Sequence, residues 1–213
     1  MGHEGHDHDH DPKHGHGHSH EHEHGHHHHG HEHGHHLPLV EPAHGTSRTA
    51  QEHKSHAPAT VSTFVVTCSD TREAVSDESG RALREGLEAA GHGIAGYKVV
   101  KDDPDAIRVA LAEAVEAGAR AVLFNGGTGI GRRDCTVETL RALFEKELPG
   151  FGELFRALSY QQIGSAAMLS RATAGTYRGM IVFAMPGSPQ AVKLALSALI
   201  LPELGHAVRE LMR

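Results

Sequence analysis

Short, mostly apolar runs alternate along the chain with longer segments in which apolar residues recur every three or four positions. The runs are TFVVT (63–67), IAGYKVV (94–100), AVLF (121–124) and MIVFAM (180–185). Runs this short predict strands, and AVLF, which has no alternation of apolar and polar residues, is predicted to be buried on both faces of a parallel sheet. Because helical segments separate the runs, the pattern predicts a doubly wound, mostly parallel α/β sheet with helices on both faces.

The helical segments are bounded by residues that favour helix ends. One segment follows residues 76–80 and ends at Gly91. The next begins at Asp103 as the cap, has Pro104 in its first position and ends at Gly118. Further helices are expected over residues 136–148, 151–159, 163–174, 190–201 and 203–212.

A glycine-rich loop, NGGTGIG (125–131), directly follows the run AVLF. Glycine permits positive φ and close approach to the main chain, and loops at the carboxyl edge of such sheets bind ligands. Arg132 stands where a Walker loop has Lys and where a dinucleotide loop has its third glycine, so neither nucleotide motif is present. From the loop alone, Asp134 either belongs to a ligand site or only favours the dipole of the following helix.

Two other strand ends are predicted to lie at the same edge of the sheet. Asp102 comes between the run at 94–100 and the helix cap at Asp103, and the tight turn PGSP (186–189) follows the run at 180–185. Asp102 and the glycine loop are therefore placed to share one cleft. Either Asp102 or Asp103 is the functional acid, and the other is purely structural.

Histidine is concentrated at the amino terminus. Of the 23 histidines, 18 lie within residues 1–36, where seven acids and one lysine contribute −6 to the formal charge of −7. This segment has no aromatic or aliphatic residue able to nucleate a core, so we expect it to be disordered without a ligand. Imidazoles beside carboxylates suit ions such as Zn²⁺ or Ni²⁺, and a purification tag is the alternative explanation. The predicted ligands of the tail include His3, His6, His8, His10, His26, His27, His28 and His29.

The rest of the chain is expected to form a linker and one domain. Residues 37–60 contain Pro38, Pro42 and Pro58 and are predicted to be the linker, and residues 61–213 suffice for one core. The domain is nearly neutral, which argues against a nucleic-acid partner. Cys68 and Cys135 have no CxxC spacing, and neither a membrane span nor a signal peptide is expected, so the protein is predicted to be cytoplasmic.

Four motifs occur in order: NGGTGIGRRDCTVETL, GFGELFRALS, IGSAAMLSRATAG and FAMPGSPQAV. In this order and spacing they resemble the MoaB/MogA family of molybdenum cofactor biosynthesis proteins, over nearly all of residues 61–213 but not the tail. The resemblance implies a molybdopterin-binding α/β domain that assembles as a homotrimer or hexamer. It also implies adenylylation of molybdopterin by Mg²⁺ and ATP, with release of pyrophosphate, before a metal-insertion step.

The resemblance assigns family positions to residues of this chain. The catalytic positions correspond to Asp134, Asp102 and Ser170, and the two aspartates are expected to hold Mg²⁺. Groups expected to bind phosphate lie in the two turns: Gly126, Gly127, Thr128, Gly129, Gly187 and Ser188. Arginines expected to offset charge or to bind the pterin phosphate are Arg132, Arg133 and Arg171.

Several alternatives stay open at this point. Ser170 is either catalytic or a hydroxyl satisfied within its own helix. Asp77 and Ser79, in a segment similar to the family's D-x-S-G, either line the cleft or cap a helix. For the whole protein, the leading hypothesis is a molybdopterin adenylyltransferase. The alternatives are a molybdopterin-binding protein without turnover, and a metal-storage or metallochaperone protein in which the tail is primary.

Overall fold

The structure is a computed structural model of the chain, and it describes residues 58–71 and 73–213. The predicted tail and nearly all of the predicted linker lie outside these residues. The described residues form a six-stranded sheet with the strand order β2-β1-β3-β6-β5-β4. The parallel strands are β1 (Ser62–Cys68), β2 (Gly93–Val100), β3 (Ala121–Asn125) and β6 (Met180–Met185). The antiparallel strands are β5 (Thr173–Tyr177) and β4 (Lys146–Glu147).

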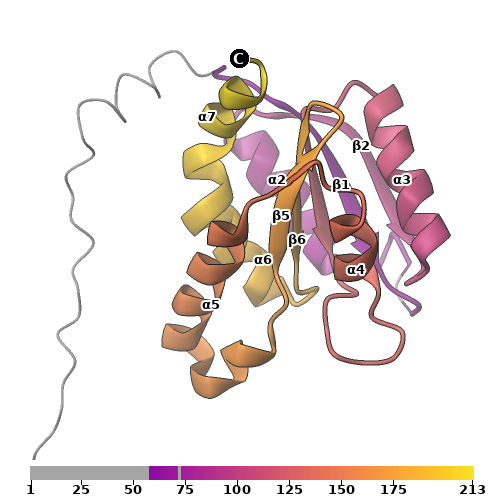
Figure 1. Cartoon of the computed structure of the whole chain (residues 1–213), viewed down its shortest axis with the longest axis vertical. Helices are drawn as coiled ribbons and strands as arrows, with labels where there is room; N and C mark the ends of the chain where they lie inside the picture. The colour runs from indigo at the N-terminus through magenta and orange to yellow at the C-terminus, as the bar shows by residue number, and fades with distance from the viewer. Residues whose placement is uncertain (1–57, 72) are drawn as a thin grey trace, which may run out of the picture. The chain divides into compact units, whose positions relative to one another are not determined.

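Helices cover both faces of the sheet, as predicted (Figure 1). One face carries α2 (Glu78–Ala89), α5 (Pro149–Ile163), α6 (Pro189–Ala195) and α7 (Leu201–Leu211), and the other carries α3 (Pro104–Glu116) and α4 (Thr136–Arg141). Neighbouring side chains of one strand enter different cores: Leu123 belongs to the buried cluster that includes residues of α2 and α6, and Phe124 to the one that includes residues of α3. This double burial explains why β3 is an unbroken apolar run.

The helix predicted over 136–148 is wrong in its second half. The structure ends α4 at Arg141, and the chain then pairs with β5, with the Glu145 N–H donating to the Thr176 carbonyl at 2.9 Å. Phe144 continues the helical period of α4, but its ring packs where Gly175 of β5 has no side chain. Contact with a strand far along the chain therefore overrides the local period.

The helix predicted over 163–174 is confirmed only in its first half, and there as a 3₁₀ helix. Gly164, at φ 62°, ends α5, and a 3₁₀ helix (Gly164–Leu169) leads into the buried strand β5. Arg178 and Gly179 both have positive φ and form the tight turn that joins β5 to β6. The small residues of β5 gave no strand signal, because their role is set by pairing with β6.

The two helices predicted over 190–201 and 203–212 form one continuous helix. A π-helical turn (Leu196–Ile200) joins α6 to α7 just before Pro202, which has no N–H to donate and whose ring crowds the preceding turn. Pro189–Leu211 is the one helix of the described part that is long and apolar enough to cross a membrane. Ile200, Leu204 and Val208 bury one of its faces in the domain core.

Candidate functional site at the carboxyl edge of the sheet

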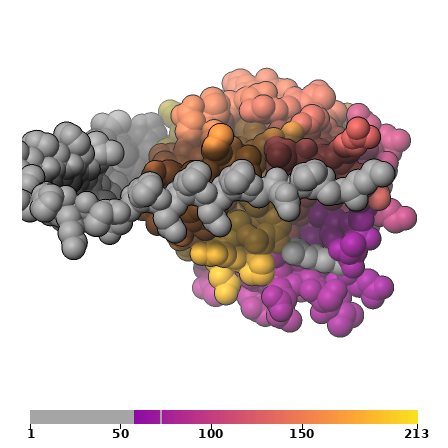
Figure 2. All heavy atoms as spheres, turned by 90° about the horizontal axis from the view of Figure 1, so that it is seen from below, coloured from indigo at the N-terminus to yellow at the C-terminus, as the bar shows by residue number. Residues whose placement is uncertain are grey.

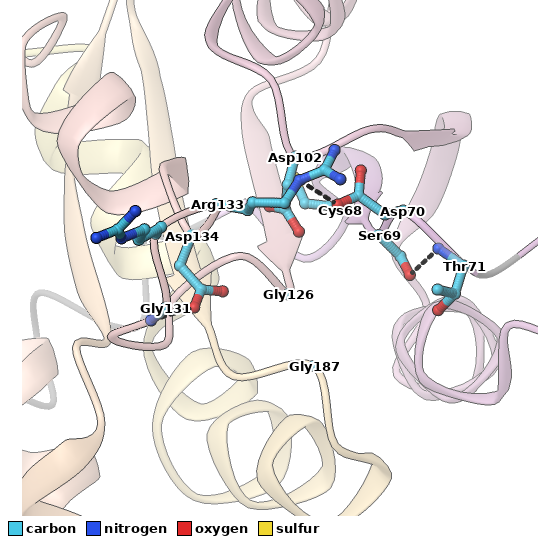
Figure 3. Close-up of a pocket in the computed structure, with 11 residues that line it drawn as sticks. Cys68, Ser69, Asp70, Thr71, Asp102, Gly126, Gly131, Arg133, Asp134 and Gly187 are labelled. Atoms are coloured by element: carbon cyan, nitrogen blue, oxygen red, sulfur yellow. Dashed lines mark hydrogen bonds and ion pairs between the residues drawn. The ribbon is translucent and has the colours of Figure 1, made fainter.

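Four strand ends surround one cleft of about 460 Å³ (Figure 3). Figure 2 looks onto this end of the domain, with purple residues from the first part of the described chain on one side and salmon residues from its middle on the other. The lining residues come from the end of β1 and from the loops after β1, β2, β3 and β6: Cys68, Ser69, Asp70, Thr71, Asp102, Gly126, Gly131, Arg132, Arg133, Asp134 and Gly187.

The structure distinguishes the two neighbouring acids after β2. The Asp103 carboxylate accepts hydrogen bonds from the backbone N–H groups of Asp105 and Ala106, both at 3.0 Å, so Asp103 is the N-cap of α3. Asp102 lines the cleft. Its Oδ1 is buried and has no hydrogen-bond partner among the described residues. Asp102 is therefore the acid available to a ligand.

Burial and neighbouring charge disfavour ionisation of Asp102. Its pKa is raised, first because burial removes water from the carboxylate and then because Asp134 and Asp70 are negative neighbours. The Thr136 hydroxyl and the Arg133 guanidinium act in the opposite direction. A divalent cation beside Asp102 would relieve the repulsion among these acids.

Gly127 lets the main chain approach Asp102 closely. A Cβ at this position would collide with Asp102 Oδ1 and Thr136 Oγ1, and its φ of 62° lies in the left-handed region. Thr136 begins α4, and its N–H donates to the Gly127 carbonyl at 3.1 Å. Because residue 127 is a glycine, the Asp102 side chain after β2 can pack directly against the loop after β3.

Asp134 closes the far end of the glycine loop. Its carboxylate accepts a hydrogen bond from the Gly131 N–H at 2.7 Å, and its own N–H donates to the Gly131 carbonyl at 3.1 Å. Gly129 and Gly131 both pass close to this carboxylate, where side chains would crowd it. The loop thus presents Asp134 in the same cleft as Asp102.

Asp70 is a site residue that the sequence pattern did not reveal. Its carboxylate lies 2.9 Å from Nε of Arg133 and joins the loop after β1 to the glycine loop (Figure 3). The only sequence signal is that Asp70 follows a buried strand at the same edge as Asp102. Arg132 and Arg133 both line the cleft, as predicted, and both side chains are exposed enough to meet an anion.

The residues of the predicted phosphate cradle differ in their exposure to the cleft. The Gly126 N–H already donates to the Met185 carbonyl at 3.1 Å, and only Gly126 of the group 126–129 lines the cleft. Gly127 and Thr128 are buried, and Gly129 is exposed outside the lining. Gly127, Gly129 and Gly131 allow the main chain to pass close to Asp102 and Asp134, and phosphate binding by the loop stays a prediction.

Comparison with known proteins identifies the domain. Residues 59–206 match the family described as a probable molybdopterin binding domain. The chain belongs to the MoaB/MogA family. It is 54% identical over 167 residues to molybdenum cofactor biosynthesis protein B of Bacillus subtilis, covering 78% of this chain and 98% of that protein. The tungsten cofactor synthesizing protein MoaB of Pyrococcus furiosus is 42% identical, with a TM-score of 0.69 over 74% of this chain and 100% of its own.

A crystal structure of a molybdenum cofactor biosynthesis protein B is also similar, with 52% identity and a TM-score of 0.71 over 74% of this chain and 99% of that one. The match to the family begins at residue 59, so the histidine-rich segment lies outside it. The resemblance stated from the four motifs is confirmed for the MoaB/MogA domain.

Asp77 of the MoaB/MogA domain is a buried cap. Its carboxylate accepts hydrogen bonds from the Gly80 N–H at the start of α2, from the Thr67 hydroxyl and from the Tyr97 hydroxyl. Burial, followed by the bond to Asp77, raises the pKa of Tyr97 to about 12. The capping interpretation of Asp77 is confirmed, and its side chain does not line the cleft.

Ser79 and Ser188 form hydrogen bonds at the turn after β6 and at the start of α6. The Ser79 hydroxyl donates to the Gly187 carbonyl at 2.8 Å and so ties α2 to the turn after β6. Ser188 caps α6, where its hydroxyl accepts the Ala191 N–H at 3.2 Å. Of these residues only Gly187 lines the cleft. A direct role of Ser188 in phosphate binding stays a prediction.

Ser170 and Arg171 do not line the cleft that holds the side chains of Asp102 and Asp134. Both line a neighbouring hollow of about 330 Å³ beside α4. Ser170 also lines a narrower pocket of about 100 Å³ that includes Ser188. The structure therefore brings Asp102 and Asp134 together in one cleft but places the third predicted catalytic residue in an adjoining one.

The cleft fits a cation that is shared with phosphate. Within residues 58–71 and 73–213, no three His, Cys, Asp or Glu side chains form a ready-made metal site. Mg²⁺ is commonly held by one or two carboxylates together with substrate phosphates and water. The partnerless Oδ1 of Asp102 and the repulsion among the acids agree with that mode of binding.

Proposed function

We propose that this MoaB/MogA domain adenylylates molybdopterin at the cleft between β1, β2, β3 and β6. An oxygen of the molybdopterin phosphate attacks the α-phosphorus of ATP, and the bond from that phosphorus to the pyrophosphate oxygen breaks. Family membership supports molybdopterin as the ligand. The role proposed for ATP and Mg²⁺ rests on one observation. The buried Oδ1 of Asp102 has no hydrogen-bond partner among the described residues, and Asp102 lines an acidic cleft.

The side chains divide this task between positioning and charge. Asp102 and Asp134 would hold Mg²⁺, which, when bound, neutralises charge on the nucleotide phosphates. Arg132 and Arg133 line the same cleft and suit phosphate oxygens that the cation leaves exposed. Transfer between two phosphates depends on holding them in line. The Asp103 cap and the close approach of Gly127 fix the position of the Asp102 carboxylate for this purpose.

Pyrophosphate release tests the proposal directly. Purified protein incubated with molybdopterin, ATP and Mg²⁺ is expected to release pyrophosphate and to form adenylylated molybdopterin, measured by coupled phosphatase assay and mass spectrometry. Omitting molybdopterin or Mg²⁺ removes the release, and so does Asp134→Ala. Binding of molybdopterin without release would replace the enzyme by the alternative, a binding protein. Release that survives Asp134→Ala would place the chemistry elsewhere.

We also propose that residues 1–36 bind transition-metal ions independently of this reaction. The support is compositional: 18 histidines interleaved with seven acids. Deleting residues 1–36 is expected to remove several bound Zn²⁺ or Ni²⁺ ions per chain, measured by isothermal titration, and to leave pyrophosphate release unchanged. Loss of release on deletion would make the tail part of the catalytic machinery, and unchanged metal binding would dismiss it as a metal site.

Self-association and a cytoplasmic location complete the proposal. Large apolar side chains of α5 and of the 3₁₀ helix after it are half-exposed or more, and covering them with a second copy would remove apolar surface from water. They are Leu154, Tyr160, Ile163, Met168 and Leu169. Sedimentation would distinguish the expected trimer or hexamer from a monomer.

A further inference from the structure

We infer that Arg171 is a positioning residue that holds the glycine loop and the backbone of Asp134 from behind, rather than a residue that binds substrate phosphate. Arg171 immediately precedes the buried segment that leads into β5, whereas the loop follows β3. Arg171 therefore links the loop to a separate part of the sheet.

All three nitrogens of the guanidinium are engaged by protein. Nε donates to the Thr128 carbonyl at 3.1 Å, and Nη2 donates to the Asp134 carbonyl at 3.3 Å. Nη1 and Nη2 both donate to the carboxylate of Glu138. The planar fork of arginine matches this set of acceptors, which lysine with one ammonium cannot satisfy together. The side chain is 29% exposed, and it does not line the cleft that holds Asp102 and Asp134.

The hydrogen bonds of Arg171 lie at both ends of residues 128–134, the segment that holds Asp134 and the two arginines of the cleft. Thr128 lies near the start of the loop and Asp134 at its end, and Glu138 lies in the first turn of α4. Glycine-rich segments lose much conformational freedom on folding and are readily displaced without such ties. Holding the carbonyls of residues 128 and 134 therefore fixes the position of the Asp134 carboxylate and of the arginines between them.

Glu138 distinguishes the two possible roles of Arg171. Burial alone would raise the pKa of Glu138, but its hydrogen bonds and the charge of Arg171 lower the pKa below its ordinary value, so the pair is ionised. If Arg171 bound phosphate, removing Glu138 would free the guanidinium and tighten anion binding. If Arg171 positions the loop, removing Glu138 loosens its side chain and weakens the site.

The test uses the full chain and four variants: Arg171→Ala, Arg171→Lys, Glu138→Gln and the control Arg213→Ala. Arg213 also pairs with a glutamate, Glu210 at 3.2 Å, but at the end of α7. Hydrogen exchange of peptides covering residues 126–134 is measured without ligand, and Mg-ATP binding and turnover are measured separately. The turnover readout rests on the proposed function, whereas the exchange readout does not.

We expect exchange of residues 126–134 to rise about tenfold in Arg171→Ala, less in Arg171→Lys and Glu138→Gln, and not at all in Arg213→Ala. Turnover is expected to fall by about tenfold in Arg171→Ala, with KM for ATP within about threefold of its original value, because geometry and not contact is lost. Unchanged exchange in Arg171→Ala, or tighter Mg-ATP binding in Glu138→Gln, would overturn the inference.

Discussion

The variant Asp102→Asn is expected to adenylylate molybdopterin at least about 100-fold more slowly than the original protein, while its fold is retained. The amide keeps the size and shape of the carboxylate but cannot hold a divalent cation through charge. The residue lines the cleft, and its Oδ1 has no protein partner among the described residues, so little structure depends on it. Turnover and thermal unfolding measured on the same preparation separate the two effects.

The same variant is expected to be more stable than the original protein at neutral pH. The folded-state pKa of Asp102 is raised, chiefly by burial and then by Asp134 and Asp70. Such a group contributes stability that is fully present below its unfolded pKa of about 3.9 and is lost as the pH rises through the folded pKa. The advantage of Asp102→Asn should therefore grow as the pH rises from about 4 to the raised folded-state pKa and level off above it, measured as the difference in unfolding free energy.

Asp103→Asn is the matched control for this prediction. It changes the adjacent acid in the same way, and asparagine caps a helix about as well as aspartate. Because, within the described part of the chain, the Asp103 carboxylate bonds to the backbone at the start of α3, turnover should persist. Equal losses in the two variants, or full turnover in Asp102→Asn, would contradict the role given to Asp102.

Local signals in the sequence sufficed for the parallel half of the sheet. The run 180–185 matches β6, and the Asp103 cap with Pro104 behind it starts α3 as predicted. These features depend on a few consecutive residues and on burial of both faces. β5 and β4 could not be predicted in this way, since Gly175 is a strand residue only because β6 and Phe144 lie against it.

A residue of the candidate site could be predicted from the sequence where its position directly after a single strand was enough to place it. Asp102 and Asp134 follow different strands, and parallel strands bring their carboxyl ends to the same edge. Asp70 was missed because its importance arises from a contact with Arg133, far along the chain. The sequence motif predicted phosphate binding for Arg171, because the three groups that accept its hydrogen bonds come together only in the folded protein.

The second large effect is expected for Gly127→Ala. The new Cβ collides with the Asp102 carboxylate and the Thr136 hydroxyl, and alanine is strained at a φ of 62°. Displacing Asp102 should reduce turnover by about 100-fold, since shifts near 1 Å are sufficient for such losses. The unfolding free energy should also fall by about 2–4 kcal/mol, from backbone strain and from crowding of buried polar groups.

Gly118→Ala separates strain from collision. Gly118, at the end of α3, has a similar φ of 69°, but nothing lies within 4 Å of a Cβ built there. Its alanine variant should lose only about 1–2 kcal/mol of stability, the cost of a left-handed residue, and should keep full turnover. The extra losses in Gly127→Ala then measure the contact with Asp102 itself. If both variants behaved alike in turnover and in chemical denaturation, the close packing of Gly127 against Asp102 would have no functional consequence, because only the backbone conformation would matter at either position.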